Sequence, residues 1–222
     1  MNDKITVRPI ELTDAEAVER YAADARVAET TNIPHPYPAN GGQEFVKRAV
    51  AGRETGQRYA FAILYEGELV GTIGINAVDK DAGTAELDYC VASPFWHKGI
   101  GSEAAGQAIE YAFEQLGLSA LFSSCLKENV ASARVLDKNG FAQIGEFTNA
   151  GEFGTKFLGR AMVRFRLKRD EKLRSDRHRQ HQAMHPTAYS PLVPRSLPAA
   201  GELDRSVAAS YFTFTHEHAY GR

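Results

Sequence analysis

The sequence predicts an α/β (α+β) domain with one mixed, mostly antiparallel sheet, one parallel strand pair, and helices on both faces. Three observations lead to this prediction. Over the first 168 residues, β-rich runs joined by tight turns alternate with segments of helical period. One strand–helix–strand unit, residues 84–126, has the length of a right-handed parallel crossover. The composition changes at about Arg169, so we expect a domain over 1–168 and an appendage over 169–222.

The overall composition is that of ordinary globular material. The 222 residues are 43% apolar and 24% charged, and the net charge of −2 gives no pull toward nucleic acid or an anionic membrane. The two cysteines, Cys90 and Cys125, are too few for a disulfide framework and lack metal-ligand spacing. The N-terminus has no signal-peptide core, and no run approaches the ~20 apolar residues of a membrane span. We therefore expect a cytoplasmic protein.

The N-terminal elements follow from alternation and capping. Residues 4–10 alternate like a short strand, and residues 12–29 have helical period with Thr13 or Asp14 as the cap. Residues 30–42 carry three prolines and two glycines, which predicts a loop. This loop is also aromatic, so we expect it to line a pocket.

The central elements are a helix and three strands. Residues 42–54 are predicted as a second short helix. Residues 58–78 are two β-rich runs around Glu66-Gly67, the turn chemistry of a hairpin. Residues 84–93 are predicted as a third long strand, which Pro94 ends.

The remaining elements complete the crossover and the sheet. Residues 101–116 are predicted as a helix that Gly117 stops, because the apolar residues between Ile109 and Leu116 recur at i, i+3, i+4 and i+7. Residues 118–126 are a strand, and residues 128–141 are a short helix. The last two strands are predicted at 141–148 and 155–167.

The appendage shows no helical or strand period. It holds five of the seven histidines and four of the nine prolines, which predicts irregular chain. His178, His181 and His185 would share one face of a helix and so suggest a metal site. A solvated basic tail explains them better, and we expect no metal.

A glycine turn precedes the crossover helix. The stretch FWHKGIGSEA, residues 95–104, places Gly99 and Gly101 at the start of a helix. Glycine permits close approach, and the free N–H groups of a helix start bind anions, so we expect a phosphate-bearing ligand. GIGSEA also fits a weak dinucleotide fingerprint, but the strand and turn are not adjacent, as that fold requires. No P-loop motif occurs.

Three stretches occur in the order typical of one known family. The strand, bulky loop and x-x-G-x-G turn resemble the acetyl-CoA pyrophosphate site of the GNAT N-acetyltransferases. AELDYCV resembles the central strand of that family, and ENVASARVLDKNGF resembles its next helix. The opening VRPIELTDAEAV and an aromatic residue at Trp96 resemble the RimJ/RimL-type, ribosomal-protein branch. The resemblance covers about residues 4–168. It implies a GNAT-like fold with a splayed parallel pair, and acetyl-CoA as co-substrate.

The resemblance also implies which residues hold acetyl-CoA. Backbone N–H groups, with added charge from a lysine, would wrap the pyrophosphate over residues His97, Lys98, Gly99, Ile100, Gly101 and Ser102. The pantetheine arm would add like a strand to the end of the central strand at Tyr89, Cys90 and Val91. Asn129 would hold the same arm, or simply cap its helix.

The same resemblance gives candidate catalytic groups. The usual acid Tyr is Leu136 here, and one common base position is Ser124. Ser132 would lie near the sulfur, where it would hydrogen-bond to the departing thiolate or protonate it. Glu86 matches a base position of the family, and its alternative is an edge carboxylate in a salt bridge. The Val91 N–H would act as a one-donor oxyanion hole, and Cys90 is a poor nucleophile candidate because no nearby group lowers its pKa.

These observations predict direct acetyl transfer from acetyl-CoA to a primary amine. An α-amine titrates near ~7.7–8.0, against ~10.4 for Lys, so a protein or peptide N-terminal α-amine needs little help from a base. The alternatives are a small-molecule amine, such as a polyamine or aminoglycoside, and a non-catalytic acyl-CoA-binding module. A homodimer is compatible with the sequence.

Overall fold

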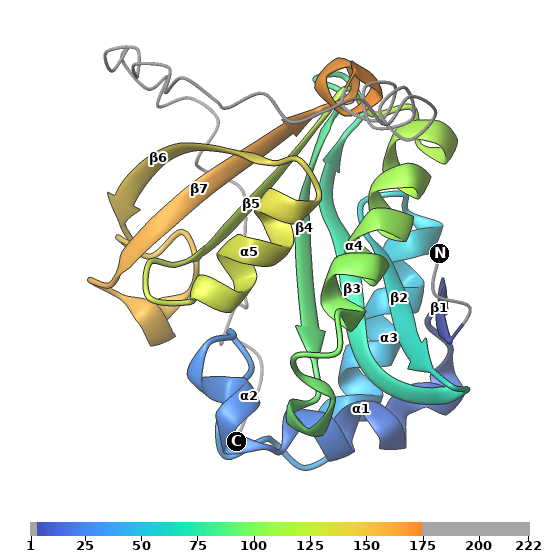
Figure 1. Ribbon diagram of the computed structural model, residues 1–222. Helices are drawn as coiled ribbons and strands as arrows, with labels where there is room; N and C mark the ends of the chain where they lie inside the picture. The colour runs from blue at the N-terminus through green and yellow to red at the C-terminus, as the bar shows by residue number, and fades with distance from the viewer. Residues whose placement is uncertain (1–3, 175–222) are drawn as a thin grey trace, which may run out of the picture.

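A computed structural model describes residues 4–174 and contains one seven-stranded mixed sheet (Figure 1). The strand order is β1-β2-β3-β4-β5-β7-β6. Every neighbouring pair is antiparallel except β4 and β5, which are parallel. The predicted fold class is therefore confirmed. Within the described residues no helix is both long and apolar enough to cross a bilayer.

Six strands lie within a few residues of their predicted positions, whereas the last begins at 161 rather than 155 because Thr155–Phe157 forms a 3-10 turn. The strands are β1 (Ile5–Pro9), β2 (Tyr59–Tyr65), β3 (Glu68–Asp79), β4 (Thr84–Val91), β5 (Ala120–Leu126), β6 (Ala142–Thr148) and β7 (Ala161–Lys168). The longer helices are α1 (Ala15–Ala22), α2 (Ala25–Glu29), α3 (Gly41–Glu54), α4 (Ile100–Glu110), which continues as a π-helical turn over Tyr111–Gln115, and α5 (Val130–Lys138). Short 3-10 turns occupy Leu12–Asp14, Ser93–Phe95 and Thr155–Phe157.

The first predicted helix, 12–29, was wrong as a single element. It divides into a 3-10 turn, α1 and α2, with the second break at Asp24. Asp24 has an extended backbone, and its side chain accepts the Arg26 N–H at 3.0 Å. An aspartate that caps a new helix competes with continuation of the previous one, so the chain turns there.

Strands β4 and β5 separate after a short paired stretch. Their pairing covers three residue pairs, from Thr84 with Ala120 to Glu86 with Phe122. Beyond it, the Ser123 hydroxyl donates to the Leu87 carbonyl at 2.8 Å, so a side chain takes the place of a ladder bond. The two strands then diverge toward the α2 end of the molecule (Figure 1).

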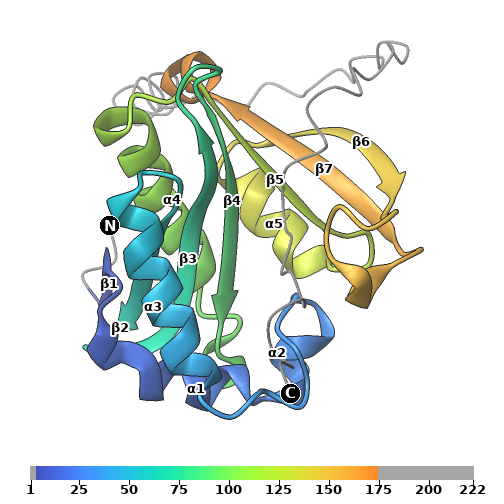
Figure 2. The same ribbon diagram turned by 180° about the vertical axis from the view of Figure 1, so that it is seen from behind.

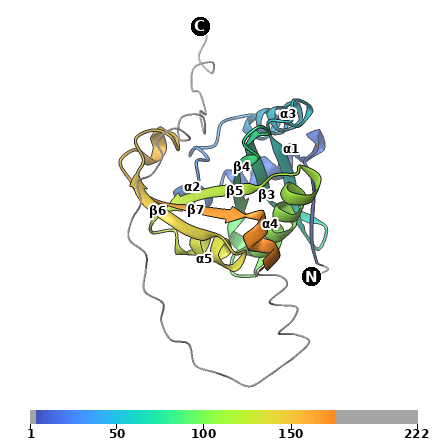
Figure 3. The ribbon, with the colours of Figure 1, turned by 90° about the horizontal axis from the view of Figure 1, so that it is seen from above.

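Helices cover both faces of the sheet. Figure 1 shows α4 and α5 in front of the strands, and Figure 2 shows α1 and α3 on the opposite face. Seen from above, the two groups form separate layers (Figure 3). The larger core, which includes Leu87 and Ile109, lies under α4 and α5, whereas the second core contains Val18 and Tyr21 of α1. Alternation along β4 therefore sends successive side chains to different layers.

The predicted appendage begins with ordered chain. Residues 169–174 are helical rather than irregular, and the Lys168 N–H donates to the Glu171 carboxylate at 3.3 Å. The rest of the appendage, with His178, His181 and His185, lies outside the described residues. The boundary at residue 168 stays a prediction.

Candidate active site

A cavity of about 1400 Å³ lies where β4 and β5 separate. Every predicted site residue except Lys98 lines it, namely Glu86, Tyr89, Cys90, Val91, His97, Gly99, Ile100, Gly101, Ser102, Asn129 and Ser132. Its wall includes residues from both faces of β4, so the cavity passes through the sheet. A typical small-molecule pocket is ~300–1,000 Å³, so this cavity has room for more than one substrate.

The glycine turn presents bare backbone at the start of α4. Gly99 has φ +78° and His97 has φ +62°, and both adopt the left-handed conformation that glycine favours. The N–H groups of Ser102 and Glu103 donate to the Gly99 carbonyl, while the earlier N–H groups of α4 have no intrahelical acceptor. A Cβ on Gly99 would meet nothing within 4 Å. This open helix start fits the pyrophosphate of acetyl-CoA.

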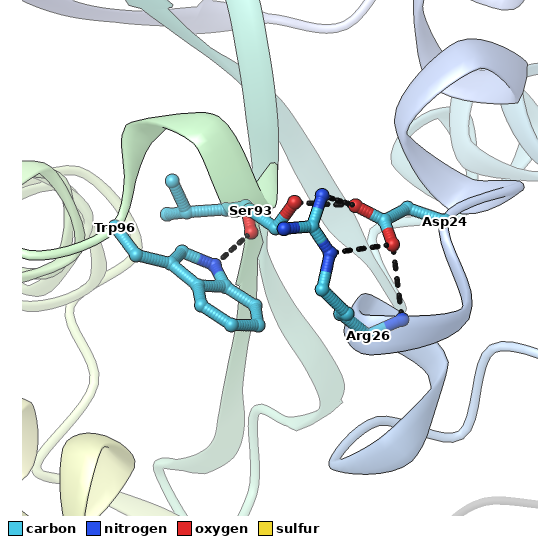
Figure 4. A network of polar contacts seen from close by, with 5 residues as sticks. Asp24, Arg26, Ser93 and Trp96 are labelled. Carbon is cyan, nitrogen blue, oxygen red and sulfur yellow. Dashed lines mark hydrogen bonds and ion pairs between the residues drawn. The ribbon is translucent and has the colours of Figure 1, made fainter.

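Two side chains beside the turn are engaged elsewhere. The Lys98 Nζ lies 4.9 Å from the Phe95 ring centroid and 5.3 Å from that of Tyr65, so this lysine packs on aromatic rings. The Trp96 indole N–H donates to the Val91 carbonyl at 2.7 Å (Figure 4). Both contacts fix the loop between β4 and α4.

A polar network joins α2 to this loop (Figure 4). The Asp24 carboxylate accepts hydrogen bonds from the Arg26 guanidinium, at 2.9 and 3.1 Å, and from the Ser93 hydroxyl. The Arg26 and Ser93 bonds hold the pKa of Asp24 well below its usual range. The start of α2 is therefore tied, through one carboxylate, to the turn that precedes the glycines.

Tyr89, Ser132 and Asn129 form a chain of contacts on the α5 side. The Tyr89 hydroxyl lies 2.8 Å from the Ser132 Oγ and donates to the Ser132 carbonyl at 3.0 Å. The Ser132 N–H donates to the Asn129 Oδ1 at 3.0 Å, so Asn129 is the α5 cap. Burial raises the pKa of Tyr89, which keeps its phenol protonated. A tyrosine hydroxyl thus reaches Ser132 although Leu136 is buried in the core.

Glu86 forms a buried ion pair, the alternative to a base role given in the sequence analysis, with a partner that the sequence did not identify. The Arg164 guanidinium donates to both carboxylate oxygens of Glu86, one of them at 2.9 Å, and to the Ser124 hydroxyl at 3.0 Å. Burial raises the pKa of Glu86, and the Arg164 bonds partly offset that effect. Arg164 stands opposite Ser124 in the β5–β7 register, which sequence reasoning could not establish.

Two further titratable groups lie on the same face of β4 as Glu86. Asp88 is half-buried beside the cavity, and burial raises its pKa to about 6. Burial also raises the pKa of Cys90 to about 12, so its thiol is protonated at neutral pH. The sequence analysis assigned no role to Asp88.

The α1 and α2 side of the cavity has mostly apolar walls. They comprise Val18, Tyr21, Val27, Ile33, Tyr37, Phe45, Phe153 and Phe157. The Tyr21 hydroxyl lies 2.8 Å from the Thr72 Oγ1. The Lys156 ammonium donates to the Thr31 and Ile33 carbonyls at 3.0 and 2.7 Å, and to the Ala28 carbonyl, so it holds the loop after α2. This half of the cavity is where an acceptor would enter.

The described residues contain no arrangement of three or more His, Cys, Asp or Glu that could hold a metal ion. A family model described as "Acetyltransferase (GNAT) domain" matches residues 4–142. The chain is 29% identical over 145 residues to "Uncharacterized N-acetyltransferase p20" of Bacillus licheniformis, a match that covers 64% of this chain and 82% of the relative.

Two solved structures share the fold. RimL, described as a ribosomal L7/L12 alpha-N-protein acetyltransferase in complex with coenzyme A, has a TM-score of 0.70 and 16% identity, over 77% of this chain and 97% of that one. Spermidine N-acetyltransferase from Vibrio cholerae, in complex with CoA and spermine, has a TM-score of 0.67 and 17% identity, over 78% of this chain and 99% of that one. The two structures differ in acceptor, so the shared fold does not specify one.

Proposed function

Because this chain belongs to the GNAT acetyltransferase family and is an acetyl-CoA-dependent N-acetyltransferase, we propose that its acceptor is a protein or peptide N-terminal α-amine. The observation that carries the proposal is the acceptor half of the cavity, which has mostly apolar walls and no surplus of negative charge in its lining. The amine attacks the thioester directly, without a covalent enzyme intermediate. Acetyl-CoA supplies the activated acetyl group.

The charge of the acceptor half supports an amine with a single positive charge. Glu86 is paired with Arg164. Among the described residues that line the cavity, the other carboxylates are balanced by cations; the carboxylates are Asp79, Asp81 and Asp88, and the cations are Arg48, Arg58, Lys80 and Arg134. A polyamine or aminoglycoside brings several positive charges, and this wall has no surplus of negative charge to match them. An N-terminal residue brings one ammonium and a side chain that the aromatic walls can cover.

Backbone groups of β4 support the assignment of the thioester end. The Ala92 N–H donates to the Val70 carbonyl across β3 and β4, so antiparallel alternation turns the Val91 N–H toward the gap beside β5. In this proposal the Val91 N–H faces the thioester carbonyl and stabilises the developing oxyanion. Tyr89 and Val91 present the strand edge along which the pantetheine arm lies.

Side chains at the start of α5 would act on the leaving thiolate in the proposed reaction. Asn129 orients the pantetheine arm, and Ser132 hydrogen-bonds or protonates the departing thiolate. The Tyr89 hydroxyl, 2.8 Å from the Ser132 Oγ, can return a proton to the serine. Glu86 is the base that the sequence nominates, but both of its carboxylate oxygens accept from Arg164, which leaves it poorly placed to take the proton of the amine.

Turnover with matched acceptors tests the proposal. Initial rates of CoA release would be measured with a free-N-terminus hexapeptide, the same hexapeptide N-terminally formylated, spermidine and an aminoglycoside. The proposal predicts the highest kcat/KM for the free hexapeptide and no turnover of the formylated one. A higher kcat/KM for either small amine would overturn the acceptor assignment. Calorimetric binding of acetyl-CoA without turnover of any amine would favour the non-catalytic module instead.

A further inference from the structure

Two carboxylates on one face of β4 have unlike surroundings. Both oxygens of Glu86 accept from Arg164, so that carboxylate is already fully engaged. Asp88 lies two residues closer to Val91 than Glu86 does. It forms no ion pair with any residue that the structure describes. It lines the cavity on the side where the acceptor enters. On this face of β4, one carboxylate is therefore held by an arginine and the other is not.

A glycine on the neighbouring strand leaves room for the Asp88 carboxylate. Its partner in the β3–β4 register is Gly74, and a Cβ on that glycine would lie 2.5 Å from the Asp88 Oδ1. The Asn76 side chain and the Gly74 N–H lie close enough to the carboxyl to lower its pKa, against the larger effect of burial. These contacts hold Asp88 against the sheet without neutralising its charge.

We propose that Asp88 is the general base of the acetyl transfer and receives the first proton of the substrate ammonium. This inference rests on amine acetylation and holds for either an α-amine or a small amine. Val91 lies three residues further along β4, roughly 10 Å at ~3.3 Å per residue. The proton therefore reaches Asp88 through water when the nitrogen stands beside the thioester.

The protons balance in two steps. The ammonium gives one proton through water to the Asp88 carboxylate, and the nitrogen lone pair then forms the C–N bond. When the tetrahedral intermediate collapses, the C–S bond breaks and its electron pair goes to sulfur. The second proton from nitrogen ends on that sulfur by way of Ser132 and Tyr89, and Asp88 returns the first proton to solvent.

The groups around Asp88 suit this role. Glu86 and Cys90 face it on β4, Tyr21 approaches from α1, and Arg58 lies before β2. Burial, with a smaller effect from Glu86, raises the pKa of Asp88 to about 6, against the opposing effects of Arg58 and Asn76. An ordinary Asp titrates at ~3.9, so this shift makes proton transfer from an amine roughly 100-fold more favourable. The carboxyl still ionises below neutral pH.

Asp88→Asn tests the inference, measured as kcat from pH 5 to 9.5 with the amine that the wild type acetylates best. For the wild type, kcat should rise through about pH 6 as Asp88 ionises and then level off. In Asp88→Asn, general-base catalysis worth ~10²–10⁴-fold should be lost at pH 7. The loss should shrink above about pH 8, where more α-amine is already neutral. Affinity for acetyl-CoA, measured by calorimetry, should not change.

Three further variants complete the test. Asp137→Asn makes the same change on an exposed position of α5 away from the cavity, and should leave the profile unchanged. Glu86→Gln should keep the rise in kcat and move it to lower pH, because a negative neighbour of Asp88 is gone. Asp88→Ser should behave like Asp88→Asn, and gives the answer if the asparagine variant does not fold.

The outcomes separate this inference from the proposed function. An Asp88→Asn profile that overlays the wild type would overturn the inference alone, as would loss of the rise near pH 6 in Glu86→Gln but not in Asp88→Asn. Preference for a small amine would overturn the acceptor assignment and leave Asp88 as the base. No turnover of any amine would overturn both.

Discussion

Replacement of Gly101 by Glu tests the placement of the pyrophosphate. Gly101 lies in the first turn of α4 without a left-handed backbone, and a Cβ there would meet the Val135 Cγ2 at 3.6 Å and the Val91 Cγ2 at 3.8 Å. Both are ordinary contact distances, so a larger residue enters without strain. An acidic residue in the first turn of a helix is also favoured by the macrodipole, by ~0.3–1 kcal/mol. The Gly101→Glu protein should therefore fold.

The same carboxylate should act strongly against acetyl-CoA. Two like charges ~4 Å apart repel by about 4 kcal/mol at the effective dielectric constant of ~20 that applies near a protein surface. Since each ~1.4 kcal/mol is a factor of ten in affinity, the Kd should rise about 10³-fold. Calorimetric titration of acetyl-CoA into wild type, Gly101→Ala and Gly101→Glu measures this directly, with thermal unfolding as the check on folding.

Gly101→Ala is the matched control, because it adds the Cβ without the charge. It should bind acetyl-CoA within a few-fold of the wild type, and should not lower the Tm, since alanine is the better helix former. A folded Gly101→Glu protein with unchanged affinity would refute the placement of the pyrophosphate at this helix start. Equal losses of acetyl-CoA affinity in both variants would mean that the added bulk, rather than the added charge, weakens binding.

Three other predictions concern the surroundings of the site. Tyr89→Phe should lower kcat about 5–10-fold with acetyl-CoA affinity unchanged, because one hydrogen bond to Ser132 is lost. A kcat equal to that of the wild type would show that Tyr89 takes no part in proton delivery to the thiolate. Ser93→Ala removes the bond from α2 to the loop and should raise the KM for the amine, whereas Ser119→Ala, at an exposed position outside the cavity lining, should not, as steady-state kinetics would show. Arg164→Met leaves the Glu86 charge buried and unpaired and should cost about 3–5 kcal/mol of unfolding free energy in urea, a cost that adding Glu86→Gln should partly reverse; additive losses in the double variant would argue against a direct pair.

The fold was largely predictable because its signals are local. The Glu66-Gly67 hairpin and the crossover from β4 to β5 follow from turn chemistry and from the period of a few neighbouring residues. The division of the first helix at Asp24 was missed. Its cause is partly tertiary, because the Asp24 carboxylate that caps α2 also accepts from Ser93, 69 residues away.

The cofactor half of the site depends on local sequence signals, whereas the acceptor half does not. The cofactor half could be predicted because two glycines and a helix start within a few residues define it. The acceptor half depends on long-range contacts: the Arg164 bonds to Glu86 span 78 residues, and the Lys156 bond to the Thr31 carbonyl spans 125. Strand register and loop packing decide such contacts, and a single sequence does not reveal either.

Mapping the acetyl group on a peptide with two amines tests directly whether the acceptor is an α-amine. The peptide would carry a free N-terminus and one internal lysine, and the product at pH 7 would be fragmented in a mass spectrometer. An α-amine is about 400-fold more often neutral than a lysine side chain at that pH, and the acceptor half of the cavity fits one ammonium with an apolar neighbour. We expect the acetyl group on the α-nitrogen. Acetyl mainly on the lysine nitrogen, above the level found without enzyme, would contradict it.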